Sequence, residues 1–477
     1  MSGLFGTLNN ATKGLNVQQS ALQTTSHNIS NANTEGYSRQ KVTMVADNPY
    51  TLGGIGQVGT GVRIASIDRI VDPYVNNQLR NENSSLEMYS QKSDVLGQLE
   101  GIFNEPSTTG LNNNLSEVFS SWTYLGSNPE LATAKTMVAQ NSETFTDTLH
   151  HMSNQIDNLH EGTVQDIEKN VLDFNSKVAQ LDSLNNQIFN VTSQGQAPND
   201  LLDQQDKLLK ELTGIAGVEA NYDKFNRLSI TVGGQSVLTE DSIAELSVGT
   251  DPIDGQLSIG GKTIAITSGN IKGSQEALTE IDTKKQELND LAFTFATAVN
   301  NIHSDGGTGA DFFELGTEDG NYAASIQVRQ EILNDVSTIN AGKNLDKVVS
   351  GDGTRAQAIA SMQNTKLDYS GNQAGMTYDK DTMTLSIINS TKGSTVSGAY
   401  NDSVTQMGIV KQQSDNMVDS QGSLVSLLEA RRDSVSGVSI NEEVTNTITY
   451  QTAFEANARI ISVVSEMLDT LINRTGV

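Results

Sequence analysis

Three patterns in the sequence combine residue types and spacings that could support chemistry, and the first is a glycine-rich loop. The segment "GIGQVG", residues 54–59, has the GxGxxG spacing with which dinucleotide-binding proteins bring backbone N–H groups close to a phosphate. Such a loop needs a strand before it and a helix after it. Here the residues that follow alternate between apolar and polar, as in a strand, so the glycines indicate a flexible turn.

The second pattern is a group of histidines beside a glutamate. His150, His151, His160 and Glu161 lie in a polar segment, but the zinc-binding HExxH motif would place a second histidine at the position of Val164. Isolated histidines on a polar helix are usually solvated side chains. We therefore expect no metal site here.

The third pattern is a set of aspartates, Asp305, Asp319 and Asp352, each followed by a glycine. A calcium-binding EF-hand would add alternating oxygen ligands and a distal glutamate, which these segments do not have. Aspartate before glycine is typical of turns. Because no nucleophile stands in a recognisable motif either, the sequence predicts no catalytic residue, no metal, no cofactor and no enzyme.

Composition narrows the possible partners. The chain has 477 residues, a net charge of −27 and no cysteine, and 36% of its residues are hydrophobic. The negative charge disfavours nucleic acid and anionic lipid, and the lack of cysteine removes disulfides and thiolate sites. No apolar run reaches the roughly 18 residues of a membrane span, and the first residues lack the pattern of a cleaved signal peptide. We expect several domains and no membrane insertion.

Both ends of the chain have the periodicity of helices with a narrow apolar seam. Leucine or isoleucine recurs every seven residues near the N-terminus. Near the C-terminus an apolar stripe of helical spacing follows a possible capping box, Ser439 with Glu442. Exposed seams need partners, so we expect the two helices to pack against each other or against neighbouring copies. The predicted assembly interface consists of Leu8, Leu15, Leu22, Ile29, Phe454, Ile461, Val464, Leu468 and Leu471.

Between the ends, helical and strand-like patterns alternate. Helical spacing covers residues 73–103, 130–194, 199–212, 271–303 and a stretch ending at 434, whereas strand patterns cover 40–71, 218–267 and 376–393. The expected fold class is mainly α with β insertions (α+β), an elongated rod of long helices built from both chain ends, with terminal coiled-coil helices. The expected domains are a terminal coiled-coil domain (1–35 and 439–477), a helical rod domain with short β segments (36–215 and 270–438) and a small inserted β domain (216–269).

Two distant segments resemble one family. "SALQTTSHNISNANTEGYSRQKV", residues 20–42, is similar to the N-terminal signature of axial flagellar proteins, the rod, hook and hook-associated subunits of the bacterial flagellum. Within it, "GYSRQ" is similar more narrowly to the hook-associated protein 1 group. "SGVSINEEVTNTITYQTAFEANARII", residues 436–461, resembles the C-terminal signature of that group. The family motif residues include Asn28, Asn33, Gly36, Tyr37, Glu442, Tyr450, Gln451 and Asn457.

The resemblance implies a structural adaptor at the hook-filament junction, which polymerises on the hook tip and allows the filament to assemble. It also implies secretion through the flagellar export apparatus to the extracellular flagellum. The implied partners are the hook protein, hook-associated protein 3, further copies in a junction ring, and an export chaperone on the C-terminal helix. Two alternatives stay open: another axial subunit of hook, rod or filament, and a secreted enzyme carried on a flagellar scaffold.

Overall fold

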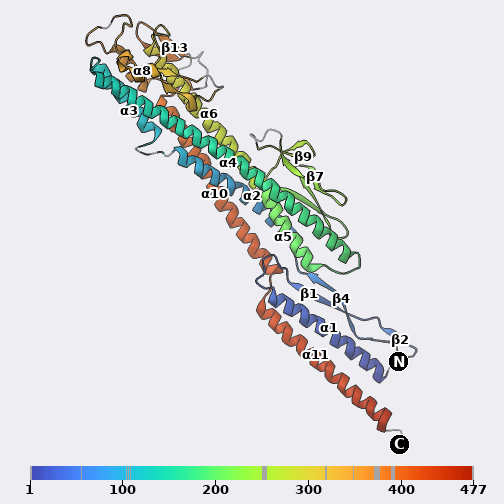
Figure 1. Cartoon of the computed structure of the whole chain (residues 1–477). Coiled ribbons are helices and arrows are strands. Elements are labelled where there is room, and N and C mark those ends of the chain that lie inside the picture. The colour runs from blue at the N-terminus through green and yellow to red at the C-terminus, as the bar shows by residue number, and fades with distance from the viewer. Residues whose placement is uncertain are drawn as a thin grey trace.

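The computed structural model is an elongated molecule of long helices, and both chain termini lie at the same end of it (Figure 1). It describes residues 3–54, 56–103, 105, 107, 109–249, 255–316, 320–347, 349–369, 376–387 and 393–474. Asp319 of the aspartate set and Ile55 of the glycine-rich segment lie outside these residues. The predicted fold class, mainly α with β insertions, is confirmed.

The rod consists of helices from both halves of the chain. They are α2 (Pro73–Phe103), α3 (Leu111–Ser127), α4 (Ala132–Thr192), α5 (Asn199–Ile215), α6 (Asn270–His303) and α10 (Val396–Ser436). The sequence predicted one or two helices over 130–194, and the structure has one, α4. At 61 residues this helix is about 90 Å long, because each residue adds about 1.5 Å. It runs along most of the rod (Figure 1).

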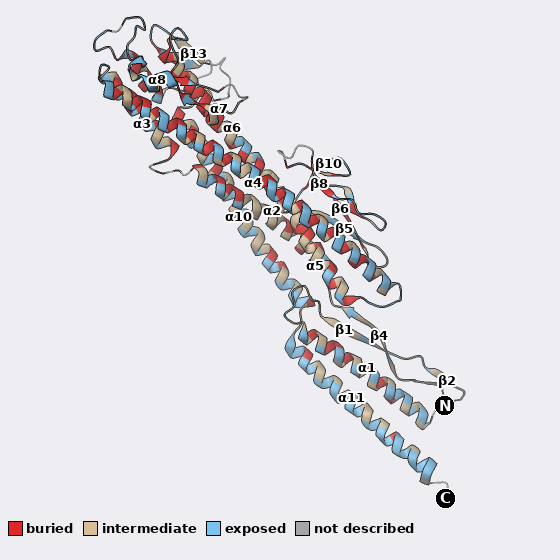
Figure 2. Ribbon diagram, viewed as in Figure 1, coloured by how far each residue is buried: buried red, intermediate tan, exposed pale blue. Residues whose placement is uncertain are grey.

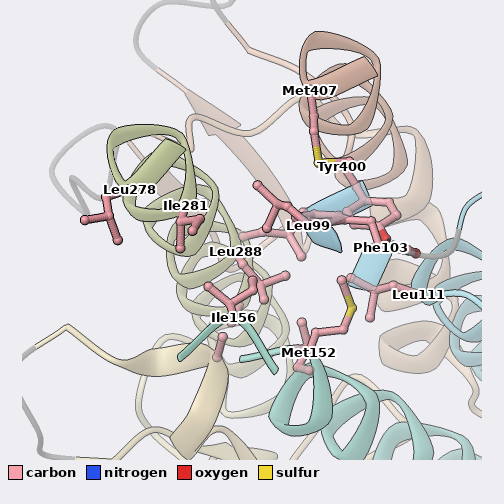
Figure 3. Packing of buried hydrophobic residues seen from close by; sticks show 14 of the residues in the cluster. Leu99, Phe103, Leu111, Met152, Ile156, Leu278, Ile281, Leu288, Tyr400 and Met407 are labelled. Carbon is pink, nitrogen blue, oxygen red and sulfur yellow. Dashed lines mark hydrogen bonds between the residues drawn. The ribbon is translucent and has the colours of Figure 1, made fainter. Parts of the chain in front are cut away.

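The core of the rod forms where the apolar stripes of these helices meet. On α4 the buried apolar residues recur every three or four positions, as at Phe145, Leu149 and Met152, and this spacing keeps them on one face. Figure 3 shows side chains of several helices converging in this cluster, among them Leu99 of α2 and Leu288 of α6. The rod therefore depends on contacts between segments that are far apart in the sequence.

Short antiparallel sheets lie along the helices. β1 (Gln40–Ala46) pairs with β4 (Val62–Arg69), and β2 (Tyr50–Leu52) with β3 (Gly56–Val58). Two three-stranded sheets follow α5, formed by β5 (Val218–Tyr222), β6 (Leu228–Val232) and β7 (Gln235–Leu238), and by β8 (Leu246–Val248), β9 (Leu257–Ile259) and β10 (Lys262–Ile264). The segment between α6 and α10 contains β11 (Phe313–Glu314), α7 (Tyr322–Ser325), β12 (Gln327–Val328), α8 (Gln330–Asn334), α9 (Thr354–Ser361), β13 (Met376–Asp379) and β14 (Thr384–Ile387).

The glycine-rich segment begins in a turn, as predicted, and continues as the strand β3. Gly54 and Gly56 have φ angles of 81° and 108°, a region that glycine enters without a Cβ clash. They lie where β2 turns into β3, and the next element is the strand β4. The segment does not have the strand, loop and helix order that a dinucleotide site requires.

Two asparagines of α4 fix the sheets that follow α5. The side-chain amide of Asn185 donates to the carbonyl oxygen of Leu228 at 2.8 Å, and its side-chain oxygen accepts from the N–H of Leu228 at 3.0 Å. Asn175 makes the same two bonds with Leu246, at 2.7 and 2.9 Å. Apolar residues of both sheets belong to the same buried cluster as the helices. This segment shares its core with the rod, and the boundaries 216–269 of an inserted domain stay a prediction.

Toward the end of the rod that lies away from the termini, His303 is buried in a neutral form. Its Nδ1 donates to the carbonyl oxygen of Ala310 at 2.8 Å, and its Nε2 accepts from the N–H of Asn340 at 3.0 Å. This pair of bonds requires a proton on one ring nitrogen only. Burial lowers the pKa of His303 to about 4, helped by the positive charges of Arg355 and Lys135 and opposed by the bond to Ala310.

We expect the unfolding free energy to fall as the pH is lowered from 6.5 to 4. The unfolded chain protonates this histidine near pH 6.5, whereas the folded chain does so only near pH 4, so acid favours unfolding by up to about 3 kcal/mol. Urea unfolding followed by the fluorescence of Trp122, the only tryptophan in the sequence, measures the effect, because its ring lies 6.4 Å from that of His303. His303→Gln should lose this part of the pH dependence. An identical dependence in both proteins would contradict the prediction.

Candidate assembly interface

The two ends of the chain form an antiparallel helix pair. α1 (Leu4–Ser30) lies beside α11 (Ile440–Asp469), at the end of the molecule that holds the termini (Figure 1). Asn28 contacts Glu443 near one end of the pair, and Gly14 lies against Asn457 near its middle. Fourteen residues along α1 therefore correspond to fourteen along α11, as in two helices that pack along their length. The two chain ends meet, which is one of the two arrangements that their apolar seams predicted.

The buried positions of α1 hold mostly small residues. Ala11, Gly14, Ala21 and Thr25 are all buried. At Gly14 an added Cβ would lie only 2.8 Å from Oδ1 of Asn457, so a side chain here would force the asparagine or the helix to move. Because the side chains at a contact set the distance between two helix axes, these residues let α1 and α11 approach closely. Their spacing of three and four residues is visible in the sequence, but the larger leucines beside them follow the same helical period.

The predicted seam residues flank this contact. In α1, Leu15, Leu22 and Ile29 each directly follow a buried residue. Each therefore points about 100° away from the buried position. Leu8, Leu15, Leu22 and Ile29 are half-buried. On α11, Val464 is buried and Phe454, Ile461 and Leu468 are half-buried, whereas Leu471, in the helical turn Thr470–Arg474 after α11, is 55% exposed. The helix pair thus leaves part of the apolar surface of most of these side chains accessible. Their role in contacts between copies stays a prediction.

The buried amide of Asn28 connects the end of α1 to the segment that follows it. Its nitrogen donates to the carbonyl oxygen of Gln40 at 2.9 Å and to Glu443 at 3.3 Å. Its oxygen accepts from the hydroxyl of Tyr37 at 2.7 Å and from the N–H of Gln40 at 3.0 Å. The chain can fold back in this way because Gly36 has a φ of 82°. Burial, and then the charges of Asp200, Asp203 and Glu443, raise the pKa of Tyr37, so its hydroxyl keeps the proton that it donates.

Arg39 joins this turn to the start of α11. Its Nε donates to Glu443 at 2.7 Å and its Nη1 to Glu442 at 2.9 Å, while its backbone N–H donates to the carbonyl oxygen of Ser436 at 2.9 Å. Glu443 is 2% exposed, so this is a largely desolvated ion pair. The predicted capping box is wrong: Ser439 occupies the N-cap position without a side-chain cap bond, and the charged guanidinium is a stronger partner for Glu442 than a backbone N–H.

Asp203 of α5 connects the same turn to the rod. Its carboxylate accepts from the N–H of Ser38 at 3.1 Å and from Arg69 at 2.7 Å, and Arg69 also donates to Asp206 at 3.0 Å. Burial raises the pKa of Asp203 although the bonds from Arg69 and Ser38 oppose this shift. We call the set Asn28, Tyr37, Arg39, Asp203 and Glu443 the motif junction. It holds together the ends of both terminal helices and the rod.

The structure brings only some of the predicted motif residues together. Gly36 shapes the junction, Asn28 and Tyr37 belong to it, and Glu442 borders it. Tyr450 and Asn457 are half-buried on α11, whereas Asn33 and Gln451 are exposed. The predicted site residues did not include Arg39, Asp203 and Glu443. For Arg39 and Glu443, the available signal was the opposite charge of the segments "SRQ" and "NEEV", which are about 400 residues apart and are paired only by the fold.

The three histidines of the predicted cluster have different surroundings and do not form one site. Nε2 of His150 lies 2.6 Å from the carbonyl oxygen of Ile326, His160 faces Asp282 at 3.4 Å, and His151 is exposed. The prediction of solvated side chains therefore holds for His151, whereas the other two are half-buried against protein groups. Among the described residues, no three histidine, cysteine, aspartate or glutamate side chains are arranged to hold a metal ion.

Asp305 and Asp352 stabilise turns, as predicted. Asp305 has a φ of 56° and accepts from the hydroxyl of Tyr378 at 3.0 Å. Asp352 accepts from the N–H groups of Lys343 at 2.8 Å and Thr354 at 3.1 Å. An aspartate that accepts from the backbone N–H two residues on, as Asp352 does from Thr354, is typical of turns. In the part of the chain that the structure describes, no helix has the length and apolarity needed to cross a bilayer.

Three family models match separate parts of the chain. Residues 96–313 match the model of the flagellar hook-associated protein FlgK helical domain. Residues 431–474 match that of the flagellar basal body rod FlgEFG protein C-terminal region, and residues 8–37 that of the flagella basal body rod protein. The last two matches cover the segments that form the helix pair and most of the motif junction.

Relatives of known identity align over the whole chain. The flagellar hook-associated protein 1 of Bacillus subtilis is 30% identical over 529 aligned residues, covering 100% of this chain and 99% of the relative. That of Salmonella typhimurium is 25% identical, covering 98% and 99%. The solved structure of the flagellar hook junction protein FlgK from Burkholderia pseudomallei has a TM-score of 0.61 at 16% identity, covering 76% of this chain and 100% of the solved chain. The chain therefore belongs to the flagellar hook-associated protein 1 family, the hook-filament junction proteins, and is a structural component of the bacterial flagellum.

Proposed function

We propose that this chain is an adaptor that polymerises at the tip of the flagellar hook and provides the surface on which the filament assembles. The observation that carries the proposal is the motif junction, because both family signatures supply its residues and the N- and C-terminal segments are both needed to build it. The junction holds α1 and α11 as one unit, and α11 keeps apolar side chains exposed. Exposed apolar side chains that are grouped along one helix are candidates for contacts with another protein.

The nine predicted seam residues contribute to contacts between copies in this proposal. All except Val464 keep accessible surface in the single chain, and a ring or helix of copies repeats each contact in every subunit. Residues 1–35 with 439–477 act as the assembling domain. The helical rod domain, 36–215 and 270–438, and the β segment 216–269 then form the outer part of each subunit.

The proposed partners are the hook protein below the junction and hook-associated protein 3 above it. The chain reaches the outside of the cell through the flagellar export apparatus, and an export chaperone holds α11 before secretion. The support is that the relatives are hook-associated proteins and that α11 exposes residues such as Val463 and Met467 in the single chain. Nucleic acid and membranes have no part in the proposal, given the charge of −27. Catalysis has none either, since the relatives are structural proteins.

A strain that lacks the gene tests the proposal. The strain should keep its hooks, secrete filament subunits that do not polymerise, and regain filaments when the gene is restored. On intact flagella of the parent strain, labelled antibody against this chain should form one narrow band between hook and filament. A label spread along the hook, rod or filament would instead identify another axial subunit. Hydrolase or metal-dependent activity that is lost on substitution of one polar cluster would support the secreted enzyme.

A further inference from the structure

The outer surface of α11 has two separate groups of exposed apolar residues. Val444 and Ile448 lie near its start, and Ile460, Val463 and Met467 lie toward its end. All five are between 43% and 60% exposed, and most of the outer face of α11 is drawn as exposed in Figure 2. We call the first group the proximal flank and the second group the distal flank.

The two flanks lie on opposite sides of α11. Glu443 and Val464 are the buried residues of this helix, and their separation of 21 residues is three heptads, so both face α1. Val444 follows the first by one residue and Val463 precedes the second by one. Because each residue turns the helix by about 100°, Val444 and Val463 point about 100° away from α1 in opposite directions.

Toward the C-terminus of α11, one of these two sides becomes less apolar and the other becomes more apolar. The residues directly after each α1-facing position are Val444, Gln451, Ala458 and Ser465, which become polar toward the C-terminus. The residues directly before each such position are Glu442, Thr449, Ala456 and Val463, which become apolar. Each side therefore has one apolar end, and the two ends are at opposite ends of the helix.

We propose that the proximal flank of one copy packs against the distal flank of the next, with the two α11 helices parallel and shifted along their axes. The separation of Val444 and Val463, 19 residues, sets this shift at about 28 Å. The inference rests on the proposed function, because it concerns how copies assemble. A contact between two different surfaces of the same chain is heterologous, and it propagates into a ring or a helix of copies.

A second copy is the occupant because both halves of the contact occur on one chain. The flanks cannot meet within a single straight helix, since they point in opposite directions. Each flank offers an area on the order of 300 Å² or less, below the roughly 800 Å² per partner of a stable complex. Each copy also carries a net charge of −27, so copies repel one another in solution. Single copies therefore stay monomeric in solution, and the contact persists only where the hook tip aligns many copies.

Cysteine cross-linking tests this contact, since the sequence contains no cysteine of its own. Full-length Val444→Cys, Val463→Cys and the double variant are expressed in a strain that lacks its own copy, and the isolated hooks are oxidised, because the proposed shift brings Val444 of one copy level with Val463 of the next. We expect each single variant to stay monomeric, a mixture of the two single variants to give dimers, and the double variant to give a ladder of dimers and longer chains. The matched control combines Thr449→Cys with Val463→Cys. Both residues lie on the same side of α11, so this pair should give no ladder.

Several outcomes would overturn the inference. Dimers from one single variant alone would indicate a two-fold symmetric contact, and a ladder from the control pair as strong as that of the double variant would show that cross-linking ignores the flanks. If the double variant is located at the hook tip without a ladder, and the pair Ile448→Cys with Met467→Cys, which has the same separation of 19 residues, also gives none, the contact is refuted while the proposed function stands. If the unmodified chain is itself absent from the hook tip, the proposed function fails, and this inference with it.

Discussion

Replacing Arg39 with methionine is expected to loosen the terminal helix pair without melting the rod. The substitution keeps the apolar length of the side chain but leaves the buried carboxylate of Glu443 with only Asn28 as its partner among the described residues. Removing one partner of a buried ion pair costs about 3 kcal/mol or more. Since Arg39 is itself partly exposed, we take about 3 kcal/mol as the upper value. Amide hydrogen exchange in α1 and α11 should then become up to about 100-fold faster.

The matched control for Arg39→Met is Glu442→Gln. Glu442 binds the same guanidinium at 2.9 Å but is 62% exposed, and exposed ion pairs contribute about 1 kcal/mol or less. This variant should exchange at nearly the unmodified rate. Exchange in α4 should be unchanged in both variants, because the junction lies outside the buried cluster of the rod. If Arg39→Met left the protection of α1 and α11 intact, the motif junction would not be what holds them. In cells, Arg39→Met should be secreted yet poorly retained on hooks.

Replacing Arg355 with methionine is expected to destabilise the far end of the rod by about 3 to 5 kcal/mol. Its side chain is completely buried and donates to the carbonyl oxygens of Ile302, Gly342 at 3.1 Å and Lys343 at 2.6 Å, and it lies 3.6 Å from Asp305. The substitution leaves these carbonyl groups without their charged donor, and unpaired buried polar groups are costly. Urea unfolding followed by Trp122 fluorescence measures the loss, because Trp122 packs against Phe312 and His303 in the same region.

Two further variants make the Arg355 prediction specific. Arg355→Lys should recover little stability, because an ammonium group lacks the planar fork that reaches several acceptors at once. Arg329→Met removes an arginine whose partner Glu331 is exposed, and it should change the unfolding free energy by less than about 1 kcal/mol. Equal losses in Arg329→Met and Arg355→Met would show that the buried hydrogen bonds are not the cause.

Much of the fold could be predicted from local sequence patterns. The helical spacing of residues 73–103 and 271–303 matches α2 and α6 almost to the residue, because apolar residues recur with the helical period throughout these segments. The glycine-rich turn was predictable in the same way, since its glycines are followed by strand alternation. The two terminal signatures identified the family, because they hold many matching residues in a fixed order.

The centre of the terminal helix pair could not be predicted in this way. Apolar periodicity indicated Leu15 and Leu22, whereas the buried residues of α1 are mostly small, and one of them, Gly14, lies directly against Asn457 of α11. A period of seven residues fits the row of leucines and the row of small residues equally well, because the two rows are adjacent on the helix surface. Which row faces the partner depends on how closely the two backbones approach, and that distance is a property of the pair.

The sequence by itself therefore determined most of the long helices, the glycine-rich turn and the family, since each depends on residues that are near one another in the chain. Only the tertiary structure decided that Arg39 binds Glu443, that Asp203 binds Arg69, and which sides of α11 keep apolar residues exposed. Charged and amide side chains can pair with many partners of suitable chemistry. Their partners are selected by the packing of helices from both ends of the chain, which places a few of them within hydrogen-bond distance and removes the competing water.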